Sequence, residues 1–378
     1  MTYNILIINW QDITHPHAGG AEVHAHEICK RLVKMGHRIT LLCCAYKGAP
    51  RREMVDGIQV LRYGYRILFN FFVPYVYYRL RQSIRFDIVI DDINKIPFFT
   101  PLFVREPVLA IVHHLFGRSI FLETGGFRAL YIHLAEKAIR LIYRNIRFVA
   151  VSRSTQQEME KWGLCCLETD IVYNGVDLNQ YAMLPELKSR TPLIGYLGRL
   201  KKYKCIEHLL EAFLQVHKRY SDACLLIVGE GDIRKRLEKR VSQLNINDYV
   251  TFTGHVTHEQ KIENLNRMWV AVNPSSKEGW GLSVIEANAC GVPVIAADSP
   301  GLRESVVHAQ TGFLFPWGDV DRMARYILTV LSGEKIRDQL SKEARSRVAR
   351  YSWTYSARKV DGIIKRLLSE SEWEGTDA

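Results

Sequence analysis

The sequence predicts an α/β protein made of two Rossmann-like domains that face one another across a cleft. Short apolar runs rich in β-branched residues alternate with stretches of helical period, the pattern of βα units around a mostly parallel sheet. The alternation pauses once, over residues 174–192, and then starts again. A chain of 378 residues is also long for one hydrophobic core. Ligands are expected at the carboxyl ends of the strands, where doubly wound folds bind them.

The first half contains six candidate strands and a helix between the first two. The helix is expected from about Ala21 to Met35 and ends at Gly36, a usual C-terminal stop. The strand candidates are NILIINW, HRITLLC, GIQVLRY, FDIVI, PVLAIV and RFVAVS.

The second half repeats the alternation after a linker. Residues 174–192 hold turn formers and a proline, so we expect an N-terminal domain of residues 1–185 and a C-terminal domain of residues 186–352. A last helix is expected at about 353–371. The strand candidates of this half are LIGYLG, ACLLIVG, YVTFTG, MWVAVNP, VPVIAA and TGFLF.

Composition is that of an ordinary soluble globular protein, with 47% hydrophobic and 24% charged residues. The net charge of +11 favours acidic partners, which are phosphorylated small molecules, anionic membranes or nucleic acid. The start MTYNILIINW lacks the features of a signal peptide, and the cysteines form no C-x-x-C motif. A cytoplasmic location with reduced thiols is therefore expected, the neighbouring pairs Cys43-Cys44 and Cys165-Cys166 included.

The most specific stretch is KEGWGLSVIEANACGVPVIA at residues 277–296. Gly279 and Gly281 disfavour a regular helix on either side of Trp280. The helix is therefore expected to begin near Leu282. Its first amides lack intrahelical partners and carry the positive end of the helix dipole, which favours a phosphate group there.

Two glutamates flank this anion site. Glu278 lies in the loop before the helix and Glu286 about one turn inside it, so their carboxylates are expected on opposite sides. Taken singly, Glu278 is also explained as a solvent-facing charge, and Glu286 as a first-turn residue that the dipole favours.

Three other strand ends carry groups suited to a nucleotide. Arg199 and Lys204 follow one strand, and two cations there suit a diphosphate, although a solvated basic turn explains the same spacing. Gly-Glu-Gly at 229–231 ends the next strand, and glycines let a ligand approach the backbone. Gly-His-Val at 254–256 ends a third, whose backbone could read a nucleobase; His255 is otherwise a surface histidine.

Together these motifs resemble the retaining, metal-independent glycosyltransferases of family 4 (group 1), which have two Rossmann-like domains in the GT-B arrangement. The family signature is a Glu-seven-residues-Glu stretch followed by an apolar strand. The likeness also covers GRLKKYK, VGEGD, FTGHV, YNGVDLNQY and TGFLFPWGD. It implies transfer of a hexose from a UDP- or GDP-linked sugar to a hydroxyl acceptor, such as a lipid-linked or growing cell-surface glycan. The anomeric configuration would be kept, and neither a metal nor another cofactor is expected.

By position, the resemblance implies roles at the donor site. Glu286 would bind the ribose hydroxyls and Glu278 those of the sugar. Arg199 and Lys204 would neutralise the leaving diphosphate, and loop 254–256 would contact the base. The implied donor-binding residues are Gly19, Gly20, Arg199, Lys204, Glu230, His255, Val256, Glu278, Gly279, Trp280, Gly281, Leu282, Ser283 and Glu286.

In the first half, Gly19-Gly20 lies where the family has a glycine loop between the first strand and helix. His113 or His114 takes the place of the family histidine near the transferred sugar; we choose His113, the first residue past its strand. Two positions depart from the family pattern: Cys205 replaces a usual glycine, and His114 a usual aspartate or glycine. The last helix would cross back to the first domain. The implied catalytic residues are His113, Glu278, Arg199 and Lys204.

Asp319-Val-Asp321 matches a metal-diphosphate pattern of other glycosyltransferases. A stretch of helical period follows it, so we interpret Asp319 as a helix cap and expect no metal.

Residues 57–86 contain no acidic residue. Their apolar run ILFNFFVPYVYY is shorter than the about 20 residues that span a bilayer. This stretch and residues 140–147 suit peripheral contact with an anionic membrane, which would place the enzyme at its inner face, but a domain core with a solvated arginine rim fits equally well. The arginines of the first stretch are Arg62, Arg66, Arg79, Arg81 and Arg85.

Two alternative functions remain open. The same fold would suit a nucleotide-sugar epimerase or a phosphorylase, the latter with pyridoxal phosphate on a lysine. From another class, the chain could be a non-catalytic membrane or nucleic-acid binding module. A nucleic-acid partner is not expected, because the second half already assigns a nucleotide to a small-molecule site.

Overall fold

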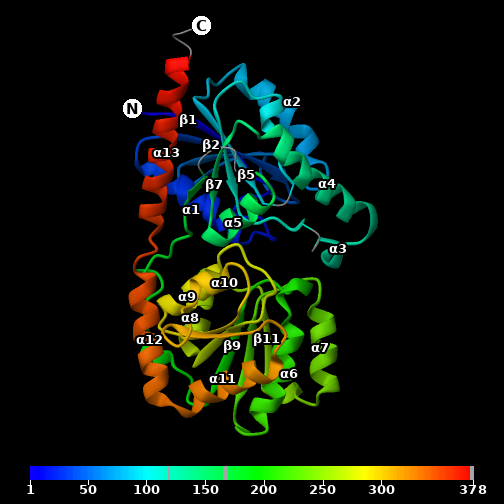
Figure 1. Cartoon of the computed structure of the whole chain (residues 1–378), viewed down its shortest axis with the longest axis vertical. Coiled ribbons are helices and arrows are strands. Elements are labelled where there is room, and N and C mark those ends of the chain that lie inside the picture. Colours follow the sequence, from blue (N-terminus) through cyan, green and yellow to red (C-terminus); the bar gives the residue numbers. More distant parts are fainter. Residues whose placement is uncertain (95, 118–119, 165–168, 375–378) are drawn as a thin grey trace. The chain divides into compact units, whose positions relative to one another are not determined.

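A computed structural model describes residues 1–94, 96–117, 120–164 and 169–374, and it divides the chain into two compact units. Unit 1 comprises residues 1–174 together with the chain from Trp353 onward, and unit 2 comprises residues 175–352. Each unit contains a mostly parallel sheet covered by helices, which confirms the predicted pair of Rossmann-like folds (Figure 1).

The division falls after Asn174, whereas the sequence places it after residue 185. The intervening segment packs with unit 2. The amide of Val176 donates to the carbonyl of Tyr351 at 2.9 Å, and the hydroxyl of Tyr181 donates to Glu286 at 2.6 Å. The turn formers therefore mark a connection that already belongs to the second unit.

The sheet of unit 1 has the order β3-β4-β2-β1-β5-β6-β7-β8, and β3 alone runs antiparallel to its neighbour. Its strands are β1 Asn4–Ile8, β2 Arg38–Ala45, β3 Arg52–Val55, β4 Ile58–Tyr65, β5 Ile88–Ile93, β6 Val108–Val112, β7 Arg147–Ala150 and β8 Thr169–Ile171. Its helices are α1 Gly20–Lys34, α2 Phe69–Arg81, η1 Thr100–Leu102, α3 Ile120–Glu123, α4 Gly126–Ile142, α5 Arg153–Lys161 and α13 Trp353–Glu374. The six predicted strands are confirmed, and β3 and β8 are additions.

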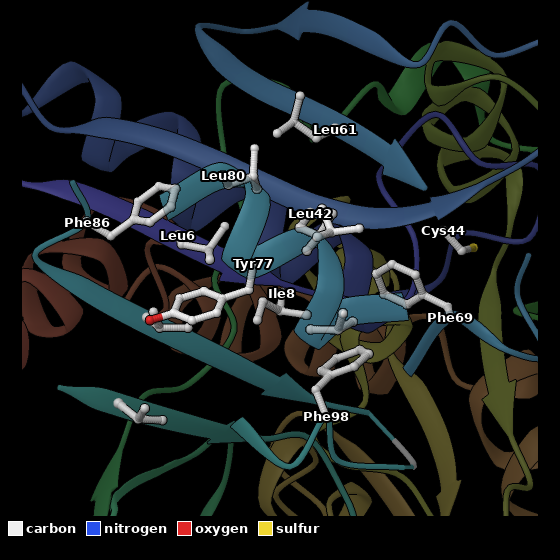
Figure 2. Close-up of a cluster of buried hydrophobic side chains, with 14 residues drawn as sticks. Leu6, Ile8, Leu42, Cys44, Leu61, Phe69, Tyr77, Leu80, Phe86 and Phe98 are labelled. Atoms are coloured by element: carbon white, nitrogen blue, oxygen red, sulfur yellow. The ribbon is translucent and has the colours of Figure 1, made fainter. Parts of the chain in front are cut away.

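One face of this sheet is buried under α2. Figure 2 shows Phe69 and Tyr77 of α2 among Leu6, Ile8 and Leu42 of the central strands, all of them buried. Apolar side chains repeat along α2 at a helical spacing, so one side of the helix faces the core. This packing explains why the segment is helical although Pro74 lies within it.

The final helix, α13, belongs to unit 1. Ser356 Oγ donates to the carbonyl of Tyr173 at 2.6 Å, and His37 Nε2 lies 3.0 Å from Asp361 Oδ1. Val360, Ile363 and Ile364 of α13 are fully buried. A helix separated from the first 174 residues by the whole second unit thus completes the core of unit 1.

The sheet of unit 2 is parallel throughout, in the order β11-β10-β9-β12-β13-β14. Its strands are β9 Leu193–Leu197, β10 Cys224–Val228, β11 Val250–Gly254, β12 Val270–Asn273, β13 Val294–Ala297 and β14 Gly312–Phe315. Its helices are η3 Pro185–Leu187, η4 Lys202–Lys204, α6 Ile206–His217, α7 Arg234–Gln243, η5 Asn247–Tyr249, α8 His258–Arg267, α9 Leu282–Ala289, α10 Leu302–Ser305, α11 Val320–Ser332 and α12 Glu334–Val348. All six predicted strands of this half are present.

No helix within the described ranges is long and apolar enough to cross a membrane. The cysteines with described positions are free thiols, and Cys165 and Cys166 lie outside the described residues. Burial raises the pKa of the Cys44 thiol to about 11, and its neighbour Cys43 is shifted in the same direction. These thiols stay protonated at neutral pH.

Candidate active site

The start of α9 in unit 2 has the geometry that the sequence predicts. Gly281 precedes the helix in a left-handed conformation, with φ +91°, and α9 runs from Leu282 to Ala289. Leu282 and Ser283 are half-buried at its first turn. The Trp280 ring points into the core, where it contacts the ring of Tyr351 with centroids 5.0 Å apart. At Trp280 a ligand could therefore be contacted by the backbone only.

Glu278 does not face solvent as a lone loop charge. It forms an ion pair with Lys204, and both side chains are largely buried. Burial opposes the charge on Lys204, but the attraction of Glu278 outweighs it and raises the pKa of the lysine. The two residues that sequence analysis assigns to sugar and diphosphate are thus brought together, as a neutral pair.

The loop that contains Arg199 and Lys204 is also joined by backbone hydrogen bonding to the loop between β12 and α9. The carbonyl of Tyr203 accepts hydrogen bonds from the amide of Ser276 at 2.9 Å and from its hydroxyl at 3.1 Å. Arg199 lies half-buried in the same loop, directly after β9. The ends of β9 and β12 therefore form one polar surface.

Cys205 lies in a left-handed turn before α6. Its φ is +51°, the left-handed conformation that glycine adopts without strain, and it caps the start of α6. A cysteine holds this conformation only with some backbone strain.

Glu286 is buried inside α9 and is held by two side chains that sequence analysis does not single out. Its Oε1 accepts from Tyr181 Oη at 2.6 Å and from Lys261 Nζ at 2.7 Å. Tyr181 lies within the linker stretch 174–192 and Lys261 lies on α8, so the three residues are distant in sequence. Tyr181 is the last residue of the motif YNGVDLNQY, so the sequence offered a signal for it. No motif pointed to Lys261.

The glycines at 229–231 have a structural reason. A Cβ on Gly229 would lie 2.1 Å from the carbonyl oxygen of Gly198, and one on Gly231 would lie 2.2 Å from that of Leu200. They allow two strand-end loops to pack, whether or not a ligand approaches them. Glu230 itself pairs with Arg234 at an exposed position.

Loop 254–256 precedes α8, whose start is fixed by a capping box between Thr257 and Gln260. His255 is exposed and Val256 is half-buried, and the amide of Gly229 donates to the carbonyl of Gly254 at 3.1 Å. The ends of β10 and β11 are thereby held side by side.

In unit 1, the glycine loop ends at a helix start. Gly19 precedes α1, and Glu22 in its first turn reaches back to accept from the Gly19 amide at 2.7 Å. Gly20 is exposed, with no atom within 4 Å of the place where a Cβ would lie.

His113 has a buried carboxylate as its partner. Its Nε2 lies 2.7 Å from Asp92 Oδ1, and both side chains are buried. His24 of α1 packs edge-on against the His113 ring, with centroids 4.9 Å apart. Burial, and then the neighbouring His113, lowers the pKa of His24 well below its ordinary value, so this ring stays neutral. His114 is half-buried and contacts the Phe116 ring.

The carboxylate of Asp92 defines the protonation pattern of neutral His113. Nε2 donates to the carboxylate, which leaves Nδ1 as the nitrogen available to accept a proton or a hydrogen bond. Sequence reasoning missed both His24 and Asp92, since each lies on a different element from His113 and matches no motif.

A second buried polar cluster holds the loop after β1. Arg62 of β4 donates to both carboxylate oxygens of Asp12, at 2.7 and 3.1 Å, and to Glu53 at 2.7 Å. Although burial opposes its charge, the hydrogen bond from Arg62 helps to lower the pKa of Asp12 to about 2. The expectation that Arg62 is one of the exposed arginines of residues 57–86 was therefore wrong: its side chain is fully buried and pairs with Asp12.

Asp319 caps α11 as predicted, accepting from the amide of Arg322 at 2.8 Å. In the described parts of the chain, one group of side chains has the arrangement of metal ligands: His24, Asp92 and His113 have atoms that all lie within 4.8 Å of one another. The direct contact of Asp92 with His113 is an ordinary hydrogen bond.

Two protein-family models match the chain. "Glycosyltransferase Family 4" matches residues 18–180, and "Glycosyl transferases group 1" matches residues 185–347. Among similar proteins, a GDP-mannose-dependent α-(1-6)-phosphatidylinositol monomannoside mannosyltransferase of Mycolicibacterium smegmatis is 26% identical, over 84% of this chain and 87% of its own.

Solved structures show the same fold. A sucrose-phosphate synthase of Thermosynechococcus elongatus superposes with a TM-score of 0.85 at 22% identity, covering 97% of this chain and 100% of that one. The HepE protein of Anabaena, solved with UDP-glucose, has a TM-score of 0.78 at 18% identity, with coverage of 96% and 100%.

Proposed function

Because the chain belongs to the glycosyltransferases of group 1, we propose that it is a retaining enzyme that moves a hexose from a UDP- or GDP-linked sugar to a hydroxyl acceptor. The observation that carries this proposal is the site around α9. There the start of α9 lies between Glu278 and Glu286 in the sequence, and each of these glutamates is paired with a lysine. The relative from M. smegmatis uses GDP-mannose and acts on a mannolipid, which supports a glycan or lipid-linked acceptor.

Donor binding would rearrange the pair of Glu278 and Lys204. The diphosphate of the donor would take over the ammonium group of Lys204, and Arg199 and the amides of α9 would share its charge. Glu278, released from the lysine, would then accept hydrogen bonds from the sugar hydroxyls. Because Lys204 compensates the charge of Glu278, an anionic donor would meet little repulsion from this carboxylate.

We assign departure of the nucleoside diphosphate to these fixed positive groups. Oriented donors and cations can stabilise the charge that develops on a leaving group without a metal ion. His113, held by Asp92, would act near the transferred sugar through Nδ1. The proposal therefore includes metal-independent transfer in the cytoplasm, with no cofactor.

The experiment is incubation with UDP-glucose, UDP-galactose, UDP-N-acetylglucosamine and GDP-mannose, with water as the hydroxyl acceptor and release of the nucleoside diphosphate as readout. We expect release from one donor, with or without EDTA, and an α-anomeric product by NMR. Glu278→Gln and Lys204→Met should each lower the rate at least about tenfold. Glu263→Gln, at an exposed position of α8, is the matched control. Absence of turnover with every donor, or inversion of the anomer, would contradict the proposal.

We also propose that unit 1 contacts an anionic membrane through an apolar surface formed by α2, the turn before it and α4, here called the aromatic surface. A hydrogen bond of 2.6 Å from Asn70 Nδ2 to Tyr131 Oη joins the two helices. Its exposed apolar members are Tyr65, Ile67, Leu68, Phe71, Phe72, Tyr75, Tyr78, Phe127, Leu130, Tyr131 and Leu134.

Exposed arginines accompany these apolar side chains. They are Arg66, Arg79, Arg81, Arg85 and Arg128. Contiguous apolar patches of this kind mark interaction sites, and the positive charge selects an anionic lipid surface. The two interpretations of this stretch, membrane contact and domain core, each describe one side of α2. Phe69 and Tyr77 belong to the core, whereas Phe71 and Tyr75 are exposed. In the stretch 140–147, Tyr143 is buried, so its contribution is limited to the exposed Arg140, Leu141 and Arg144.

A further inference from the structure

The carboxylate of Glu286 is held asymmetrically. Both hydrogen bonds it receives from described residues end on Oε1, one from Tyr181 Oη and one from Lys261 Nζ. Oε2 has no hydrogen-bond partner within the described ranges. The Lys261 ammonium also lies 5.2 Å from the centre of the Tyr181 ring, so the three groups form one cluster.

The cluster is built into the fold from three sides. Glu286 is 6% exposed and Tyr181 is 5% exposed, whereas the Lys261 side chain is 21% exposed at the border of the site. Arg345 fixes the backbone of Tyr181 by donating to its carbonyl at 3.3 Å. The His258 ring, at the start of α8, packs edge-on against the Tyr181 ring with centroids 5.3 Å apart.

Two donors occupy the two lone pairs of Oε1, so this oxygen has little capacity for a third hydrogen bond. The pair also fixes the rotation of the carboxylate, and the lysine compensates its charge, which would be costly to bury alone. The oxygen that remains for a ligand is Oε2.

We propose that Lys261 and Tyr181 are positioning residues for nucleotide recognition: they reserve Oε1 for the protein and present Oε2 alone to a ribose hydroxyl of a nucleoside diphosphate. This inference rests on the proposed function, with the ribose of the donor at Glu286 as the family resemblance implies. It adds that ribose is recognised by one carboxylate oxygen in a fixed orientation, and that a lysine on α8 determines this orientation.

A positioning role for Lys261 and a purely electrostatic role predict different changes in the affinities of two ligands. Without Lys261, the carboxylate can rotate and carries an uncompensated charge, so binding of a ribonucleotide weakens. A 2′,3′-dideoxyribonucleotide lacks the hydroxyls that meet Oε2, so the orientation of Glu286 matters little to its affinity. A charge effect on the diphosphate would instead weaken both ligands equally.

The test is calorimetric titration of the full chain with UDP, GDP and ADP and with their 2′,3′-dideoxy forms. For the base that the wild type binds best, Lys261→Met should weaken the ribonucleotide about tenfold and the dideoxy form less than about threefold. Tyr181→Phe, which keeps the ring, should give an intermediate loss. Lys261→Arg should restore most of the preference for ribose, because a guanidinium can also donate to Oε1.

Lys239→Met, at an exposed position of α7, is the matched control and should leave both affinities unchanged. Thermal unfolding of each variant reports whether the fold is kept; should Lys261→Met unfold, the Arg and Phe variants carry the comparison. An unchanged ratio between ribo and dideoxy affinities in Lys261→Met or Tyr181→Phe overturns the inference while the proposed function stands. A wild type that binds none of the three diphosphates overturns both.

Discussion

At the scale of single residues, the main feature is a set of ion pairs whose side chains are largely buried. Lys204 compensates Glu278, Lys261 compensates Glu286, and Arg62 compensates Asp12. Each pair joins loops or elements that are distant in sequence. Breaking such a pair by removing one partner leaves a charge without compensation, which costs more than an exposed ion pair contributes. The loops at the strand ends are therefore fixed by charge as well as by backbone hydrogen bonds.

Asp91 of β5 is a buried acid that forms no ion pair with any described residue, and it predicts a dependence of stability on pH. Burial raises its pKa from 3.8 to about 6, although hydrogen bonds from Tyr143 and Thr100 oppose the shift. Between about pH 4 and pH 6 the folded protein holds a proton that the unfolded chain has released, so stability falls as pH rises through this window.

The expected size is roughly 3 kcal/mol, since each pKa unit corresponds to about 1.4 kcal/mol. Asp91→Asn carries no titrating group at this position, so the difference in free energy of unfolding, variant minus wild type, should increase by that amount from pH 4 to pH 7. Urea unfolding of both proteins at several pH values measures the difference. A constant difference across this range would show that Asp91 is ionised in the folded protein throughout.

At the scale of elements, α2 serves two purposes. Its buried side closes the core of unit 1, and its opposite side exposes aromatic residues next to those of α4. An interfacial helix needs an apolar side and nearby basic residues, and α2 has both without being long enough to span a bilayer.

The aromatic surface predicts binding to anionic vesicles. Phe71 and Tyr75 are 66% and 62% exposed, so Phe71→Ser with Tyr75→Ser should leave the fold intact. We expect the double variant to lose at least about fivefold in affinity for vesicles containing phosphatidylglycerol, measured by co-sedimentation. Tyr355→Ser, 65% exposed on α13, is the matched control. Equal binding by the double variant and the wild type would exclude this surface as the contact.

Two strands, β3 and β8, were not predicted from the sequence, and each omission has a physical reason. β3 is an edge strand with the sequence REMV and alternating exposed residues, so it has no apolar run. β8 is only three residues long. The other strands are buried in parallel sheets, where continuous apolar runs are strong signals.

The site was predictable where chemistry follows a short motif. Glu278, Glu286 and the start of α9 could be placed from glycine spacing and helix capping, because these are local effects. The contact of Asp92 with His113 and that of Lys261 with Glu286 could not, because each pairs residues from different elements through tertiary packing. The buried state of Arg62 was missed for the same reason, since its partners lie at Asp12 and Glu53.

At the scale of the whole molecule, two units of the same architecture carry different chemistry. Unit 2 holds the paired glutamates and lysines suited to a nucleotide sugar, and unit 1 holds the buried histidines and the aromatic surface suited to an acceptor at a membrane. The net charge of +11 agrees with two anionic partners, a diphosphate donor and a lipid surface.

The most direct test of the account is the thermal unfolding of the full chain with UDP, GDP or ADP at millimolar concentration. A ligand that binds only the folded state raises its stability, and saturation at about 100 times the dissociation constant contributes about 2.7 kcal/mol. We predict that one of the three diphosphates raises the unfolding temperature by about 2–5 °C and that Glu286→Ala abolishes this rise. No rise with any of them would contradict a nucleotide-sugar donor site at α9.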